Sequence, residues 1–171
     1  VFRVAFGALM LIEVVRFFPS IAPPYLEPSF HFTFHGLGWI RPWPDNGMYV
    51  HFAVLSLAAL FITIGLFYRA AALVFCVGLG HVFLLEQATY LNHIYLIILL
   101  SFLLIFVPAH GAWSVDAWLR PRLRSQVAPM WALWLLRAQV GIPYFYGGLA
   151  KLNHDWLRGQ PLKMWLQDYA D

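Results

Sequence analysis

A lysine near the C-terminal end of the chain has the surroundings that best suit acid–base chemistry. Lys151 follows the apolar and aromatic run 144–150 and lies shortly before Trp156. Such neighbours desolvate an amine partly, which disfavours the ammonium form and lowers its pKa. We therefore predict that Lys151 is a general base, and the alternative is a lysine that snorkels to the membrane surface.

A histidine at the start of another apolar run is the second candidate. His93 follows Asn92 directly and is expected at the same membrane depth as Lys151, where an imidazole is a hydrogen-bond donor. Tyr144 offers a ring with a polar tip, and Arg137, which keeps its charge, needs an anionic or carbonyl partner. From the residue types, Lys151 is a candidate base and His93 a candidate hydrogen-bond donor, with a satisfied core histidine as the alternative. Asn92, Tyr144 and Arg137 are candidate pocket residues.

The remaining histidines do not have the spacing of a metal site. His31 and His35 are four residues apart, but they lie in a proline-bounded stretch and form no His-Glu-x-x-His pattern. We expect interfacial polarity there and predict no metal.

The elements that must position these residues are membrane helices. The chain has 171 residues, of which 61% are hydrophobic and 11% are charged, whereas soluble domains carry about 25% charged residues. A chain this short cannot bury so much apolar surface in a water-facing fold. We predict an all-α integral membrane protein, and the high aromatic content excludes a disordered chain. The net charge of +3 indicates lipid rather than nucleic acid, because the basic residues flank hydrophobic runs.

Five apolar runs predict a bundle of about five transmembrane helices, near residues 2–18, 50–68, 70–86, 91–107 and 130–149. The proline-rich segment 19–47 predicts a long ordered loop or lid after the first helix. Helices two and three are expected to be linked only at Tyr68 and Arg69, so they must be antiparallel neighbours.

The distribution of Lys and Arg predicts the orientation of a multi-pass protein. One side collects Arg3, Arg69, Arg120, Arg122 and Arg124, and we expect that side to be cytoplasmic. Arg3 is expected to snorkel to that surface, and Glu13 to pair with Arg16 one helical turn away. The long first loop, the turn before His93 and the end of the fifth helix then share the extracytoplasmic face. We expect an apolar, aromatic-walled pocket there, among helices three to five, for a lipid-soluble substrate. The tail around 161–166 is expected to form a short interfacial helix.

Seven motifs occur in order along the chain, and together they resemble the membrane part of vitamin K-dependent γ-glutamyl carboxylases, within the horizontally transferred transmembrane (HTTM) domain family. They are Val1-Phe-Arg-Val-Ala-Phe-Gly7, Gly65-Leu-Phe-Tyr-Arg69, Val82-Phe-Leu-Leu-Glu86, Asn92-His93-x-Tyr95-Leu, Trp113-Ser-Val-Asp116, Leu136-Arg-Ala-Gln139 and Tyr144-Phe-x-x-Gly147-x-x-x-Lys151-Leu-x-x-Asp155-Trp156. The resemblance implies one HTTM-type domain over residues 1–171. Because the chain does not begin with Met, we expect it to be part of a longer protein.

The resemblance implies a coupled oxidation and carboxylation. Reduced vitamin K reacts with O2 to give its epoxide and supplies the base that removes a γ-proton from a glutamate, to which CO2 then adds. By motif position, Lys151 is similar to the residue that deprotonates the hydroquinone, and His93 to the one that stabilises the oxygenated form. The animal enzymes carry a second lysine where Ala150 stands and continue into a large extramembrane part. The implied partners are therefore membrane lipid, a glutamate-containing protein substrate and a C-terminal region of the parent protein.

The same residues are compatible with two alternative functions. A noncatalytic membrane module that binds a quinone or lipid, or anchors a partner, would keep the bundle without the chemistry. A transporter segment is less favoured, because the chain has no internal repeat and few polar positions along a path.

Overall fold

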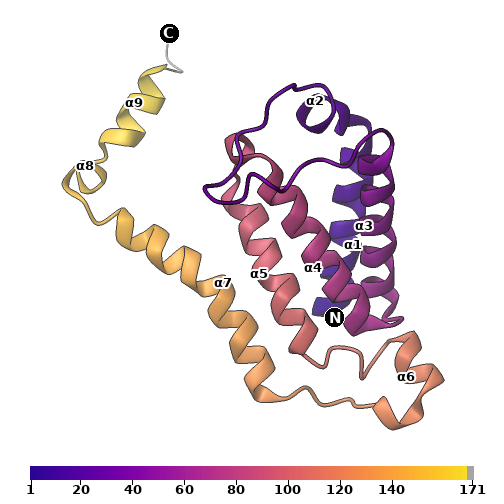
Figure 1. The fold of residues 1–171 in the computed structure, drawn as a ribbon. Coiled ribbons are helices and arrows are strands. Elements are labelled where there is room, and N and C mark those ends of the chain that lie inside the picture. The colour runs from indigo at the N-terminus through magenta and orange to yellow at the C-terminus, as the bar shows by residue number, and fades with distance from the viewer. Residues whose placement is uncertain (169–171) are drawn as a thin grey trace. The chain divides into compact units, whose positions relative to one another are not determined.

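The computed structural model describes residues 1–168 and is helical. Helices make up 70% of the chain, and residues 1–168 contain no strand, which confirms the all-α prediction. The chain divides into two compact units, Val1–Leu133 and Trp134–Asp171. Figure 1 labels the helices of both units.

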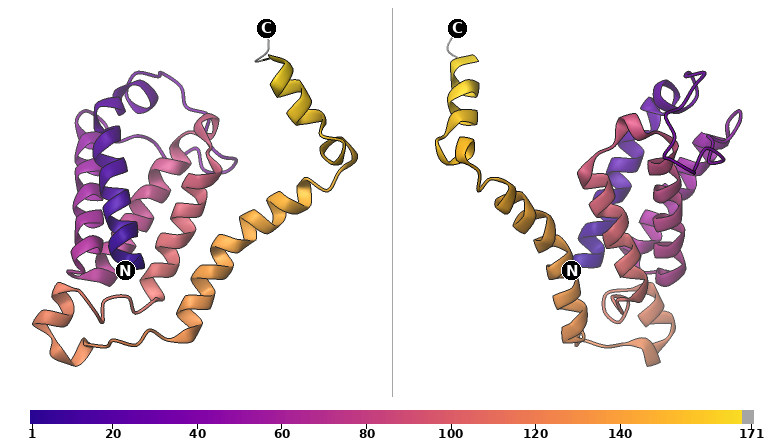
Figure 2. Two further views of the ribbon diagram at one scale, coloured as in Figure 1. Left: turned by 180° about the vertical axis from the view of Figure 1, so that it is seen from behind. Right: turned by 60° about the vertical axis from the view of Figure 1, so that its left-hand side comes forward.

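Four long helices form the first unit: α1 (Phe2–Phe17), α3 (Gly47–Ile64), α4 (Tyr68–Leu85) and α5 (Asn92–Phe106). Successive helices run in opposite directions, and α1 packs against α3, α3 against α4, and α4 against α5 (Figures 1 and 2). Between α1 and α3 the chain forms the turns η1 (Phe18–Ser20) and α2 (Ala22–Tyr25) and then a long loop. Shorter elements follow the long helices, namely η2 (Gln87–Thr89), α6 (Val115–Leu119) and η3 (Pro121–Leu123).

Two of the five predicted spans are long and apolar enough to cross a membrane by length and composition. These are α3 and α4, with 18 residues each. The helices α1 and α5 occupy the predicted places but have only 16 and 15 residues. An α-helix rises 1.5 Å per residue, so these two are shorter than the hydrocarbon core of a typical bilayer.

The link between α3 and α4 lies three residues before its predicted place. Gly65 ends α3 with a φ of 71°, and Phe67 also has a positive φ of 43°. The Asp116 carboxylate accepts hydrogen bonds from the backbone N–H groups of Phe67 and Tyr68, at 3.0 and 2.9 Å. The expected link at Tyr68 and Arg69 is therefore wrong, because Asp116 satisfies the first amide groups of α4 and lets the helix begin at Tyr68.

The prediction that Arg3 snorkels to the cytoplasmic surface is wrong. Its side chain is buried, and one guanidinium nitrogen donates to the carbonyls of Ile62 and Thr63 at 2.7 and 2.9 Å. The other terminal nitrogen donates to the Trp113 carbonyl. The last carbonyls of α3 have no donors within the helix, so they attract a cation more strongly than the surface does. The predicted Glu13–Arg16 pair is confirmed at 2.6 Å.

The second unit contains most of α7 (Met130–Ala150), α8 (His154–Leu157) and α9 (Gln160–Asp168). The helix α7 continues through Pro143. Asn153 is the N-cap of α8, and its side-chain oxygen accepts the Trp156 N–H at 3.0 Å. The expected short helix in the tail is present as α9, with apolar side chains exposed at Leu162, Met164, Trp165 and Leu166.

Candidate functional site

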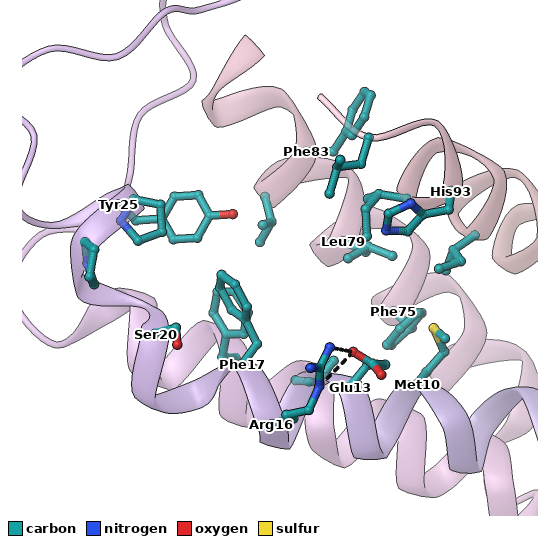
Figure 3. A pocket seen from close by; sticks show the side chains of 18 residues that line it. Met10, Glu13, Arg16, Phe17, Ser20, Tyr25, Phe75, Leu79, Phe83 and His93 are labelled. Carbon is teal, nitrogen blue, oxygen red and sulfur yellow. Dashed lines mark hydrogen bonds and ion pairs between the residues drawn. The ribbon is translucent and has the colours of Figure 1, made fainter. Parts of the chain in front are cut away.

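A cavity of about 750 Å3 opens in the first unit, near the end that carries the long loop. Its lining comes from α1, α2, α3, α4 and α5 and from the segments that join them (Figure 3). Most of the lining is aliphatic or aromatic. The lining residues are Met10, Glu13, Val14, Arg16, Phe17, Ser20, Pro23, Pro24, Tyr25, Phe52, Phe75, Leu79, Val82, Phe83, Leu91, His93, Ile94 and Ile97. Cavities of this size and lining suit small apolar ligands that a few polar groups orient.

His93 is the predicted catalytic residue that this cavity includes. It is the second residue of α5, which begins after the extended backbone of Leu91. Its ring points toward the cavity (Figure 3). Asn92 starts the same helix turn and is exposed, outside the lining residues. The structure therefore places one of the two neighbouring polar residues in the cavity wall.

The long loop contributes to the cavity through its first turns. Pro23, Pro24 and Tyr25, which belong to α2, are lining residues. The first turns of segment 19–47 thus form part of the cavity wall. Tyr25 was missed in the sequence, because no local pattern distinguishes it from the other aromatic residues of the loop.

Glu86 connects the loop at His31 and Phe32 to the turn before α5. Its carboxylate accepts from the Phe32 N–H at 3.3 Å and from the Ala88 N–H at 3.0 Å, and it lies 3.3 Å from the His31 ring nitrogen. The Gln87 N–H donates in turn to the Phe32 carbonyl at 2.7 Å. The loop and the turn before His93 thus meet at one end of the unit. These two segments were expected to share one face.

A charged pair on α1 supplies the remaining strong polarity of the cavity wall. Glu13 and Arg16 hydrogen-bond to each other at 2.6 and 3.2 Å, and their side chains are 54% and 75% exposed. The two charges neutralise each other, so the pair makes this part of the cavity wall polar without an unpaired charge. Its place in the wall was also missed, because the one-turn spacing indicates a pair but not what the pair faces.

The other predicted site residues lie in the second unit. Arg137 and Tyr144 are seven residues apart on α7 and therefore on one face of the helix, and Lys151 follows at the same spacing just past its end. The Arg137 guanidinium lies 5.7 Å from the Trp134 ring centroid, and the Lys151 amine lies 5.1 Å from that of Trp156. Both cations thus have aromatic neighbours, and Lys151 is exposed.

The pocket has a different wall from the predicted one. Helices three and four of the prediction, α4 and α5, do line the cavity, but α1, α2 and Phe52 of α3 line it too. All its lining residues belong to the first unit. Among residues 1–168, no three His, Cys, Asp or Glu side chains lie close enough together to hold a metal ion.

Comparison with protein families connects this arrangement to known proteins. The family model described as the HTTM domain matches residues 1–171, the whole chain. No solved structure matches the chain. HTTM is a membrane domain, and the match agrees with the two apolar helices and the apolar cavity. The chain belongs to the HTTM domain family, consistent with the HTTM domain of vitamin K-dependent carboxylase-like proteins.

Proposed function

We propose that the protein oxidises reduced vitamin K with O2 to the epoxide and couples this to carboxylation of protein glutamate by CO2. The observation that carries the proposal is that His93, in the Asn-His-x-Tyr-Leu motif, faces an apolar cavity within an HTTM domain. The cavity suits a lipid-soluble hydroquinone, because its wall is mostly apolar with a few polar groups. When bound, reduced vitamin K supplies the strong base that the carboxylation needs.

Each proposed site residue has a role that its chemistry allows. The Lys151 amine in its neutral form accepts a proton from a hydroquinone hydroxyl. The His93 imidazole donates a hydrogen bond to a ligand oxygen where charge develops. Arg137 and Tyr144 share the helix face that leads to Lys151, and we assign them and Asn92 to holding the ligand. No metal takes part in this proposal.

The membrane arrangement is part of the proposal. We infer that α1, α5 and α7 join α3 and α4 as a five-span bundle in one domain over residues 1–171, with the cavity end extracytoplasmic. Membrane lipid surrounds the bundle, and a glutamate-containing protein and a C-terminal region of the parent protein are the proposed partners.

The proposal is tested with the full-length protein in detergent. Reduced vitamin K is added without oxygen, air is admitted, and the epoxide is measured by chromatography for the wild type, Lys151→Ala and the matched control Lys163→Ala. Loss of a general base lowers a rate by about 100-fold or more, so we expect epoxide from the wild type and the control but about 100-fold less from Lys151→Ala. Hydroxide replaces the missing base as pH rises, so the variant's rate should increase with pH more steeply than that of the wild type.

The competing function is a noncatalytic quinone- or lipid-binding or anchoring module. The observation that favours it is the mostly apolar lining of the cavity, which suits binding of a lipid-soluble ligand without any further chemistry. If folded wild-type protein binds vitamin K but forms no epoxide, this second function is supported. Equal epoxide from the wild type and Lys151→Ala would contradict the role of Lys151.

A further inference from the structure

Tyr25 carries a polar group of the cavity that neither the ion pair nor the motifs explain. It is the last residue of α2, and its side chain is only 8% exposed. Its ring lies 6.3 Å from that of Phe17 and 6.1 Å from that of Phe52. Two helices thus fix the direction of the Tyr25 ring.

The Tyr25 hydroxyl points into the cavity. Figure 3 shows it on one wall and the His93 ring on the other side of the open space. No hydrogen bond joins this hydroxyl to another of the lining residues drawn there, whereas Glu13 and Arg16 satisfy each other. The hydroxyl faces the open cavity, so a ligand that fills the cavity would cover it, and a polar atom of that ligand is the partner that this position suits.

The hydroxyl is a donor rather than a base. Burial, together with the negative charge of Glu86, raises the pKa of Tyr25 to about 12. The phenol therefore keeps its proton at physiological pH and can donate a hydrogen bond to an acceptor oxygen. A quinone carbonyl, or a hydroquinone oxygen, is such an acceptor.

We propose that Tyr25 is a ligand-binding residue that donates a hydrogen bond to one ring oxygen of a 1,4-quinone or hydroquinone, while His93 contacts the oxygen at the opposite end of the ring. This inference rests on the proposed function, because it names the ligand class of the same cavity. A site with a donor at each end favours rings with two opposed oxygens, because an analogue without them leaves a buried donor unpaired. The binding half of the inference also holds for a protein that binds the quinone without oxidising it.

The experiment measures the dissociation constants of two probes with full-length protein in detergent. One probe is menaquinone-4, and the other is the hydrocarbon analogue in which both ring oxygens are replaced by hydrogen. The variants are Tyr25→Phe, which keeps the packed ring, and the matched control Tyr49→Phe, whose tyrosine packs on Phe18 outside the cavity lining. Size-exclusion chromatography establishes that each variant is folded.

Removing one hydrogen bond should weaken menaquinone-4 binding by about 2- to 12-fold in Tyr25→Phe. Binding of the hydrocarbon analogue should not weaken, because Tyr25→Phe removes the donor that this analogue leaves unpaired. Tyr49→Phe should match the wild type with both probes. An equal loss for both probes would show that Tyr25 only shapes the cavity, and an unchanged menaquinone-4 affinity would show that the hydroxyl does not meet the ligand. Either result overturns the inference.

A double-mutant cycle with His93→Phe tests the opposed arrangement. If the two residues contact different oxygens, their effects on menaquinone-4 affinity add to within about 2-fold. Strong non-additivity would place both on one oxygen and overturn the two-ended arrangement.

The outcomes for binding and for chemistry are separable. Tyr25-dependent binding without epoxide would support this inference and contradict the catalytic proposal. Epoxide formation with no effect of Tyr25→Phe on menaquinone-4 affinity would support the catalytic proposal and contradict this inference. A folded wild type that binds neither probe would overturn both.

Discussion

Replacing Arg3 by methionine should destabilise the first unit far more than its place near the N-terminus suggests. Arg3 is 2% exposed, and its guanidinium donates to the carbonyls of Ile62, Thr63 and Trp113, which lie on two separate segments. A hydrogen bond from a charged donor contributes about 1.5–3 kcal/mol net, whereas burying the cation costs several kcal/mol. Arg3 makes three such hydrogen bonds, so after the burial cost is subtracted we expect Arg3→Met to lose about 3 kcal/mol.

Lysine at the same position distinguishes the geometry of the guanidinium from its charge. Arg3→Lys keeps a buried cation but lacks the planar fork that reaches both segments, so its loss should equal or exceed that of Arg3→Met. The free energy of unfolding is measured in mixed micelles with increasing sodium dodecyl sulfate, followed by circular dichroism. Arg16→Met is the control on the same helix, because its exposed ion pair contributes about 1 kcal/mol or less. A lysine variant as stable as the wild type, or an Arg3→Met loss no larger than that of the control, would refute the reasoning.

Two further changes at the same end of the unit have defined outcomes. Asp116→Asn should cost about 1–2 kcal/mol in the same unfolding assay, because an amide cannot accept from both Phe67 and Tyr68 N–H groups as the carboxylate does; an unchanged stability would contradict this capping role. Burial, assisted by Arg69, lowers the pKa of His110 from 6.5, so the unfolded chain takes up a proton before the folded one does. Stability should therefore be full above pH 6.5 and fall below it, and His110→Phe should flatten this loss when unfolding is followed from about pH 7.5 to about pH 5. A variant with the same acid slope as the wild type would show that other groups cause it.

The sequence predicted the helices well, because their signal is local. Each of α1, α3, α4, α5 and α7 begins and ends within about four residues of its predicted run, since apolar residues continue until a proline, glycine or polar residue interrupts them. The Glu13–Arg16 pair was predicted for the same reason, because one helical turn separates the two residues.

The errors concern contacts between residues far apart in the sequence. Arg3 was expected at the surface because its neighbours do not reveal carbonyls 59, 60 and 110 residues away. Tyr25 was not predicted for the cavity, because its place depends on rings from α1 and α3. Periodicity identifies which face of a helix is apolar, but which side chains meet depends on how several helices pack.

The family motifs within the first unit separate into two groups with different physical roles. Motifs 1–7, 65–69 and 113–116 meet at one end, where Arg3 and Asp116 connect them through backbone groups. Gly7 belongs to the same group, because a Cβ there would lie 2.7 Å from the Thr63 backbone nitrogen, so α1 and α3 can approach closely only with glycine. Motifs 82–86 and 92–96 lie at the other end, where Glu86 holds the loop and His93 faces the cavity. The motifs of the first group therefore stabilise the helix arrangement, whereas those of the second group lie at the cavity end. Substitutions in the first group should change the free energy of unfolding with little effect on quinone affinity per folded molecule, and substitutions at His93 should do the opposite.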